Sequence, residues 1–271
     1  MPVLKHDVFF RQHPVFTGDE LARHLARIGS HGVRTPERVL GYHIKSGRLR
    51  RVRQGLYAVI PPGVDGDTYP VDPYLVAAKM TPDAVLSHHT ALELHGRAYS
   101  VWQRFVYSSE RPTETLTFRD QVFRGTKFPQ ALVRSGAEYH GVLTVERFGM
   151  PLRVASLERT LVDALDRPDL AGGWEEVWRS LEAVEFFDLD EVVEYALLLG
   201  NATTTAKVGF FLDQNREPLM VEERHLKALR DRGPGQPHYL DRSRRSGGKL
   251  VPEWNLMVPE EVLTQSWADV A

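Results

Sequence analysis

The sequence predicts an α+β protein, in which an N-terminal winged helix-turn-helix is followed by a mixed α/β region. Two short helix patterns and an arginine-rich hairpin pattern follow one another within residues 15–60. Residues 1–58 hold 11 Lys and Arg against 4 Asp and Glu, a net charge of +7, whereas the other 213 residues carry −9. Such polarity indicates that one end of the chain binds nucleic acid. Beyond residue 73, β-branched and aromatic runs alternate with amphipathic helix patterns.

The first helix of this N-terminal region is predicted to begin after Thr17. Thr17 and Glu20 have the spacing of a capping box, in which each side chain accepts a hydrogen bond from the other residue's backbone amide. Gly29 is expected to end the helix. One apolar stripe at helical spacing should face the core: Leu21, Leu25 and Ile28.

The second helix is the candidate recognition helix. Thr35 should cap it, Pro36 suits its first position, and Ser46-Gly47 should end it. Arg38 is the best candidate for reading bases, because a guanidinium can bond guanine O6 and N7 together. Its expected DNA-facing residues are Arg34, Thr35, Arg38, Tyr42 and Lys45, with Glu37 on the same face and His43 near its edge. An ordinary solvated helix face is the alternative interpretation.

Residues 48–60 read as a β-hairpin with its turn at Gly55. Leu49 and Val52 should both pack inward although their parity differs, which predicts a bulge or tight twist between them. Four arginines and a glutamine lie near the tip, without an interleaved acid: Arg48, Arg50, Arg51, Arg53 and Gln54. A wing of this kind contacts phosphates or a narrow minor groove. The alternative is an edge hairpin that charge keeps from aggregating.

Length and composition indicate two domains, or three if the C-terminal part divides. The expected boundaries are 1–60 for the winged helix-turn-helix, 61–73 for a Pro/Gly-rich linker and 74–271 for an α/β domain, with a helical subdomain from about residue 156 as the alternative division.

The absence of cysteine excludes disulfides and fits a reducing cytoplasm. Residues 1–13 lack the pattern of a signal peptide, and the uncharged run 195–206 is too short to span a bilayer. We therefore expect a cytoplasmic location.

Local patterns place the remaining elements. Helices are expected at 73–80, from Thr81 or Asp83 to His95, and after Ser156, which should cap a helix with Arg159 and Thr160 in its first turn. Strands are expected at 100–108, 113–123, 130–134, 141–146 and near 250–258. Further helices are predicted near 174–185, 188–199, 202–214 and 219–231, and a Gly/Pro-rich loop at 233–248.

A group of histidines and a glutamate is the most enzyme-like feature: Ser87, His88, His89, Glu93 and His95. His89 and Glu93 can share a helix face, but zinc needs about three convergent ligands and no third one stands at metal spacing. We therefore expect no metal or other cofactor. The predicted roles are structural, with Ser87 capping a helix and the histidines bonding backbone or lining a surface.

Acidic residues are concentrated between 158 and 200. Glu158, Asp163, Asp166 and Asp169 could serve a metal-dependent nuclease, although no convincing acid-plus-lysine triad accompanies them. Residues 160–200 hold 11 acids against two arginines. This surface could dock a basic protein partner, repel DNA from this part of the chain, or be a solvated helical face. A second basic cluster, 241–249, is either a phosphate contact or a surface loop.

Three phrases in this order resemble the AbiEi-like antitoxins of abortive-infection, type IV toxin–antitoxin systems. The first runs from Gly47 to Tyr57 and matches a G-x-L-x-R-V-x-x-G-x-Y pattern. The second is LSHHTALELHG at 86–96, and the third is VASLERTLVD at 154–163 followed by Gly172-Gly173. Trp254-Asn255-Leu256 is a weaker echo near the C-terminus.

The resemblance implies a bacterial protein that is not an enzyme. Its winged helix would bind inverted repeats in the promoter of its own operon and repress transcription, as a monomer or a homodimer on double-stranded DNA. Its C-terminal domain would counteract a nucleotidyltransferase-like toxin, directly or indirectly, without any membrane association. The resemblance assigns no catalysis to the Ser87-His88-His89 phrase.

Overall fold

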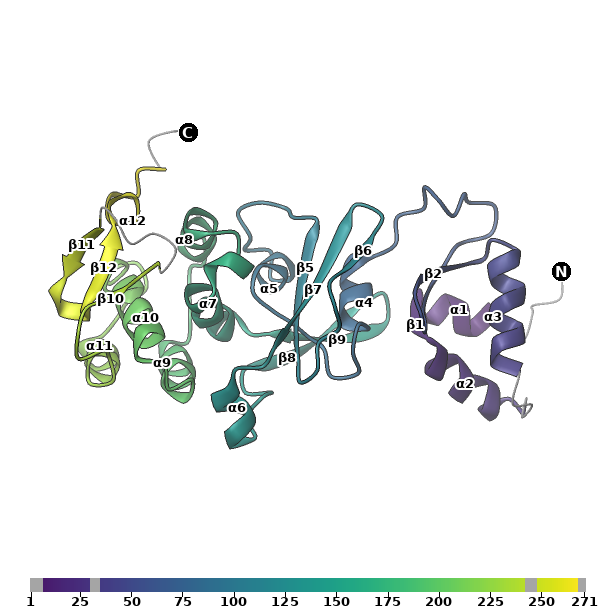
Figure 1. Ribbon diagram of the computed structural model, residues 1–271, viewed down its shortest axis with the longest axis horizontal. Helices are drawn as coiled ribbons and strands as arrows, with labels where there is room; N and C mark the ends of the chain where they lie inside the picture. The colour runs from purple at the N-terminus through teal and green to yellow at the C-terminus, as the bar shows by residue number, and fades with distance from the viewer. Residues whose placement is uncertain (1–6, 30–34, 242–247, 268–271) are drawn as a thin grey trace. The chain divides into compact units, whose positions relative to one another are not determined.

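The computed structural model describes residues 7–29, 35–241 and 248–267, which form a mixed α+β fold (Figure 1). The chain divides into two compact units. The first comprises the described residues up to Leu86 together with Gln103–Gly125 and Thr144–Arg153. The second comprises Ser87–Trp102, Thr126–Leu143 and the described residues from Val154 onward. Each unit is therefore assembled from segments that are distant in sequence.

The first unit begins with three helices and a small sheet. In chain order these are α1 (Asp7–Gln12), β1 (Val15–Thr17), α2 (Gly18–Arg27), α3 (Thr35–Lys45), β2 (Leu49–Arg53) and β3 (Leu56–Val59). The strands form an antiparallel sheet in the order β1-β3-β2. Neither α1 nor β1 was expected from the sequence, because each is too short to show a clear periodicity.

The local signals around α2 are confirmed. Thr17 Oγ1 accepts from the Glu20 amide at 3.3 Å, and Glu20 Oε2 accepts from the Thr17 amide at 2.7 Å. Gly29 follows the helix with φ of 79°. The expected apolar stripe is wrong at its end, since Leu21 and Leu25 are buried but Ile28 is 39% exposed. Ile28 is the C-cap residue, where the helical direction of side chains is lost.

The hairpin β2–β3 has the predicted bulge. Arg51 pairs with Tyr57 and Arg53 with Leu56, so the register shifts around Val52. This extra residue lets Leu49 and Val52 both be buried despite their opposite parity. The side chains of the three helices and this sheet share one core, whose buried members are Phe9, Phe10, Phe16, Leu21, Leu25, Leu40, Leu49 and Tyr57.

A six-stranded sheet follows, in the order β6-β7-β5-β4-β9-β8. Its strands are β4 (Val85–Leu86), β5 (Arg104–Ser109), β6 (Leu116–Phe118), β7 (Gln121–Lys127), β8 (Val142–Arg147) and β9 (Met150–Ala155). Three short helices lie between these strands or before them: α4 (Pro73–Ala78), α5 (His89–Leu94) and α6 (Gln130–Ser135).

Three expectations for this region are wrong. In place of the helix expected from Thr81 or Asp83 to His95, the structure has the buried strand β4 followed by the short helix α5. His88, directly before α5, has a positive φ of 53°, which a continuous right-handed helix cannot include. The strand expected at 130–134 is α6, which Pro129 and the left-handed Gly136 delimit. Strand β9 was not expected at all, and the run 113–123 is divided between β6 and β7.

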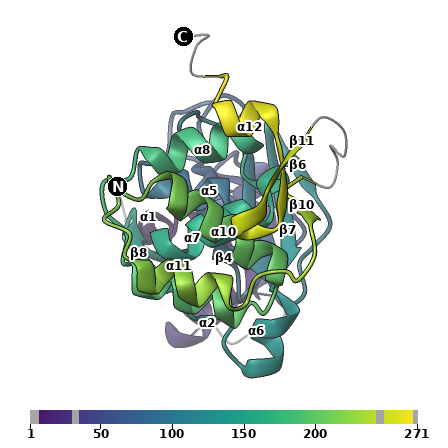
Figure 2. The ribbon, with the colours of Figure 1, turned by 90° about the vertical axis from the view of Figure 1, so that its left-hand side faces the viewer.

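The rest of the second unit is mainly helical (Figure 2). It contains α7 (Leu157–Asp166), the 3₁₀ turn η1 (Pro168–Leu170), α8 (Trp174–Glu182), α9 (Leu189–Leu198), α10 (Ala202–Gln214) and α11 (Glu223–Arg230). A small sheet, β10-β12-β11, is formed by β10 (His238–Tyr239), β11 (Gly248–Val251) and β12 (Leu256–Pro259). The turn η2 (Pro252–Trp254) and α12 (Glu260–Thr264) complete the described chain. The predicted helices of this part, including the Ser156 cap, are confirmed.

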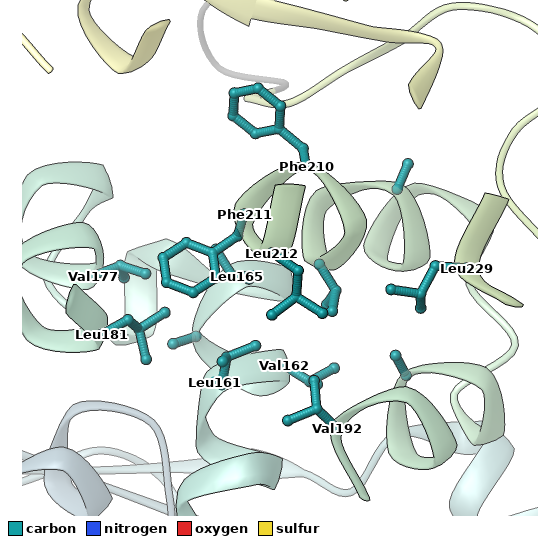
Figure 3. Packing of buried hydrophobic residues seen from close by; sticks show 14 of the residues in the cluster. Leu161, Val162, Leu165, Val177, Leu181, Val192, Phe210, Phe211, Leu212 and Leu229 are labelled. Carbon is teal, nitrogen blue, oxygen red and sulfur yellow. The ribbon is translucent and has the colours of Figure 1, made fainter. Parts of the chain in front are cut away.

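Helix α10 is central to the core of the second unit. Figure 3 shows Phe211 and Leu212 of α10 pointing among side chains of α7, α8 and α9. Helices α7, α9 and α11 all pack against α10. Gly209 belongs to this packing, because a Cβ at that position would overlap the ring of Trp254. The weak C-terminal phrase with Trp254 therefore has a packing role.

Candidate nucleic-acid interface

Helix α3 presents one polar face to solvent. Arg38, Tyr42 and Lys45 are exposed, Tyr42 at 64%, and their spacing of four and three residues places them along one side of the helix. Leu40 and His43 lie on the opposite side and are buried. The expectation that His43 lies near the outer edge is wrong, since its ring packs edge-on against Phe10 at 4.9 Å. Thr35, half-buried, is the first residue of α3 instead of the residue before it.

The hairpin adds exposed polar groups from a second element. Arg51 and Gln54 are exposed, on β2 and in the turn that follows it. Among the residues that the structure describes, Arg38, Lys45 and Arg51 take part in no ion pair, whereas the remaining arginines of the hairpin do have partners within the chain. These three cations are therefore available to an external anion.

Arg48, Arg50 and Arg53 are engaged inside the first unit. Arg48 pairs with Asp7 at 2.6 Å, and its guanidinium lies over the ring of Phe10 at 5.3 Å. Arg53 donates to the backbone carbonyl of Met80. The exposed Arg50 pairs with Asp67, in the segment expected to be a linker. The sequence prediction missed these partners because they lie between 17 and 41 residues away along the chain.

The segment 61–73 makes contacts with several parts of the first unit. Arg119 donates to the carbonyls of Gly66 and Tyr69. Asp72 caps α4 and pairs with Arg147 at 2.6 Å. Arg119 thus holds the middle of the segment, and Arg147 holds its C-terminal end. Arg34, a predicted DNA contact, lies outside the described residues. So do residues 242–247 of the predicted basic cluster 241–249, whose described Lys249 pairs with Glu260 at 2.8 Å.

Glu20 connects α2 to the chain that follows the hairpin. Besides its role in the capping box, its carboxylate pairs with Lys79, the C-cap residue of α4. Burial raises the pKa of Glu20, but the hydrogen bonds from Lys79 and Thr17 outweigh that effect and lower it. The carboxylate therefore stays ionised at neutral pH and holds α2 and α4 together.

The Ser-His-His phrase forms a buried polar network in the second unit. His89 lies at 3.0 Å from Glu176 Oε1 and stacks on Trp102 with 4.4 Å between ring centroids. His95 bonds the backbone carbonyl of Ala155 at 2.7 Å, as expected. The prediction that Ser87 caps a helix is wrong, since its hydroxyl lies at 3.0 Å from His88 Nδ1 and the helix begins later, at His89.

Glu176 is the centre of that network. Its carboxylate accepts hydrogen bonds from the Ser100 amide at 2.9 Å and the Ser100 hydroxyl at 2.7 Å, in addition to its contact with His89. Burial raises the pKa of Glu176, but these hydrogen bonds and the charge of His89 lower it to about 2. Gly172 makes room for the carboxylate stem, because a Cβ there would lie 2.6 Å from Glu176 Cβ. The first glycine of the Gly172-Gly173 phrase therefore has a steric reason.

The third phrase forms another buried network around Arg159, which is 1% exposed. The guanidinium donates to the carbonyls of Glu138 and His140 at 2.8 and 2.7 Å and pairs with Asp163 at 3.4 Å. Tyr195 donates to Asp163 Oδ1 at 2.8 Å. Burial raises the pKa of Tyr195 well above its usual value, and the Asp163 carboxylate acts in the same direction. The arginine thus ties α7 to the loop before β8.

The acids considered for a nuclease are distributed over separate contacts. Asp166 accepts from Thr204, and Asp169 forms a bidentate pair with Arg167 at 2.9 and 3.0 Å. Glu158 accepts from the amide of Asp188 at 3.3 Å. In the part of the chain that is described, no three His, Asp or Glu side chains are grouped so that they could hold a metal ion.

No protein-family model matches the chain, and no curated protein matches it either. Among solved structures, the chain is similar to the Rv2827c protein of Mycobacterium tuberculosis, with a TM-score of 0.62 and 19% identity over 97% of this chain and 93% of that one. At this identity, the likeness shows a shared fold over nearly the full length of both chains. None of the helices within the described ranges has the length and apolar character that crossing a bilayer requires.

Proposed function

We propose that this chain is a sequence-specific double-stranded DNA-binding regulator, with residues 7–60 acting as a winged helix-turn-helix. In this proposal α3 is the recognition helix and the β2–β3 hairpin is the wing. The observations that carry it are the exposed Arg38, Tyr42 and Lys45 on one side of α3 and the exposed Arg51 on β2, a strand that packs against α3. Lys and Arg side chains that form no ion pair within the described chain can bind DNA phosphates and base edges.

The internal contacts divide the predicted DNA-binding residues into two classes. Arg38, Lys45, Arg51 and Gln54 are assigned to the DNA, since they are exposed. Arg48 and Arg53 are assigned to holding the module in shape, because their guanidinium groups are used by Asp7 and by the carbonyl of Met80. Arg50 would have to leave Asp67 before it could reach a phosphate.

The biological role that we propose follows the resemblance described above. The chain would repress its own operon by binding inverted repeats, as a monomer or homodimer, and would counteract a nucleotidyltransferase-like toxin through its second unit. The buried networks around Glu176 and Arg159 support a structural role for the two phrases shared with the AbiEi-like antitoxins. No catalytic step is proposed.

The direct test is a gel-shift titration with DNA from immediately upstream of the native operon. Random DNA serves as the competitor, at two salt concentrations. We expect a discrete complex that survives the competitor and weakens steeply with salt, because phosphate neutralisation releases counterions. Binding that random DNA abolishes at equal concentration would remove the claim of sequence specificity, and absence of any salt-sensitive complex would remove DNA binding altogether.

A further inference from the structure

Residues 61–69, which we call the strap, lie between β3 and α4 within the first unit and are held through their backbone. Arg119 donates to two carbonyls of the strap, of which that of Gly66 is at 2.5 Å. A Cβ built at Gly66 would lie 3.5 Å from Ile60 Cγ1 and 3.8 Å from the carbonyl oxygen of Gly47. The strap therefore packs against the turn between α3 and β2, at the base of the hairpin.

The second half of the strap is a hydrogen-bonded turn built on Asp65. The Tyr69 amide donates to the Asp65 carbonyl at 3.0 Å, and the Thr68 hydroxyl donates to the same carbonyl at 3.3 Å. The Asp67 amide donates to Asp65 Oδ1 at 3.0 Å, which is the bond by which an aspartate fixes the turn that follows it. The carboxylate of Asp67 takes part in none of these bonds.

The Asp67 carboxylate instead forms an ion pair with Arg50 of β2. The two side chains are 69% and 49% exposed, so the pair stands in water. Exposed ion pairs of this kind contribute little to stability. The larger consequence of the pair concerns charge, because one of the four arginines of the hairpin is neutralised by an acid of the strap.

A carboxylate and a phosphate are alternative partners for a guanidinium, since both accept two of its N–H groups. While Arg50 is bound to Asp67, it cannot neutralise a DNA phosphate and release the counterions of that phosphate. Arg51, the next residue, is in the opposite situation, because it forms no ion pair with another described residue. Phosphate contacts carry no sequence information, so the effect of Asp67 should be the same on every DNA.

We propose that Asp67 is an autoinhibitory residue, whose carboxylate occupies Arg50 in place of a DNA phosphate and lowers the affinity of the chain for any double-stranded DNA. This inference rests on the proposed DNA-binding function. The strap sets the strength of binding without changing the preference between sequences. Its effect is faster release from DNA, because differences in affinity between variants of one interface lie mostly in the dissociation rate.

The test compares wild type and Asp67→Asn in the full-length chain, by salt titrations of binding to DNA from upstream of the native operon and to random DNA. The matched control is Asp120→Asn, because Asp120 is an exposed aspartate of the same unit, in the turn between β6 and β7, and pairs with no other described residue. For Asp67→Asn we expect the affinity for both DNAs to rise about three- to eightfold at about 0.1 M salt, and the slope of log affinity against log salt concentration to steepen by about one unit. The gain should be absent in Asp120→Asn and should disappear in the double variant Asp67→Asn/Arg50→Ala.

Three results would overturn the proposal. They are equal slopes for wild type and Asp67→Asn, an equal gain in Asp120→Asn, and a gain that persists in the double variant. Thermal unfolding of each variant checks that the fold is intact, and an exposed pair should leave its midpoint nearly unchanged.

The same titrations separate this proposal from the proposed function. Sequence-specific binding with no difference between wild type and Asp67→Asn would refute autoinhibition and leave the proposed function standing. Equal affinity for both DNAs, with tighter binding by Asp67→Asn, would refute sequence specificity and leave the role of Asp67 standing. The absence of any salt-sensitive complex would refute both.

Discussion

Gly172→Ala is the substitution whose effect can be worked out most fully from the structure. Gly172 has φ of +103°, and a Cβ at this position would lie 2.6 Å from Glu176 Cβ and 2.9 Å from Trp102 Cζ2. The Glu176 Cβ atom is fixed by α8, so it cannot move aside as a flexible side-chain end would. Backbone strain costs about 1–3 kcal/mol and overpacking about another 1–3 kcal/mol. We therefore expect the free energy of unfolding to fall by about 2–6 kcal/mol.

Gly173→Ala is the matched control in the neighbouring position. Gly173 has φ of +93°, but no atom lies within 4 Å of a Cβ built there. Its substitution should incur the backbone strain alone, about 1–3 kcal/mol. Urea unfolding followed by tryptophan fluorescence would measure both variants, with unchanged m-values as the check that the comparison is valid. Equal destabilisation by the two substitutions would refute the steric explanation for Gly172.

Four other substitutions test the Glu176 network, the division of the hairpin arginines and the packing of α10. Glu176→Gln should lower the free energy of unfolding by about 1–3 kcal/mol at pH 6. Because the pKa of Glu176 is about 2 in the folded protein and its usual value is 4.5, the difference in stability from wild type should shrink as the pH falls from about 4.5 toward 2. A difference that does not depend on pH would contradict this reasoning. Arg51→Ala should reduce the slope of log affinity for DNA against log salt concentration by about one unit. Arg53→Ala should leave this slope unchanged and lower the stability of the chain. Equal slopes for the two variants would show that the assignment of Arg51 to DNA and of Arg53 to internal bonding is wrong. Gly209→Ala should lower the midpoint temperature of thermal unfolding, because the added Cβ would overlap the Trp254 ring. Alanine favours helices more than glycine does, so a raised midpoint temperature would show that α10 tolerates the change.

Features determined by neighbouring residues could be predicted from the sequence. The capping box of Thr17 and Glu20, the Ser156 cap and the bulge near Val52 all depend on residues within a few positions of one another. The five helices from α7 to α11 were also predictable, because their apolar faces repeat over two turns or more. In each of these cases the deciding interaction is local.

Helices too short to show a clear period, and features determined by distant residues, could not be predicted. The ends of α6 depend on Pro129 and the left-handed Gly136, and the short helix between them has too few residues for its period to be distinguished from that of a strand. The separation of the hairpin arginines into exposed and internally paired ones depends on Asp7, Asp67 and Met80, which no local pattern connects with the hairpin. The backbone position of Ser100 and Trp102 likewise depends on carboxylates from two helices, Glu176 of α8 and Glu93 of α5.

The most direct test of the central claim compares the affinity of wild type and Arg38→Ala for operator DNA and for random DNA of equal length, at one salt concentration. Arg38 is exposed on α3, and we propose that it contacts the edge of a base instead of a backbone phosphate. We expect the ratio of the affinity for operator DNA to that for random DNA to fall about 10- to 100-fold in the variant, which corresponds to about 1–3 kcal/mol, with little change on random DNA. An equal loss of affinity on both DNAs, or no loss on either, would contradict the assignment of α3 as the recognition helix.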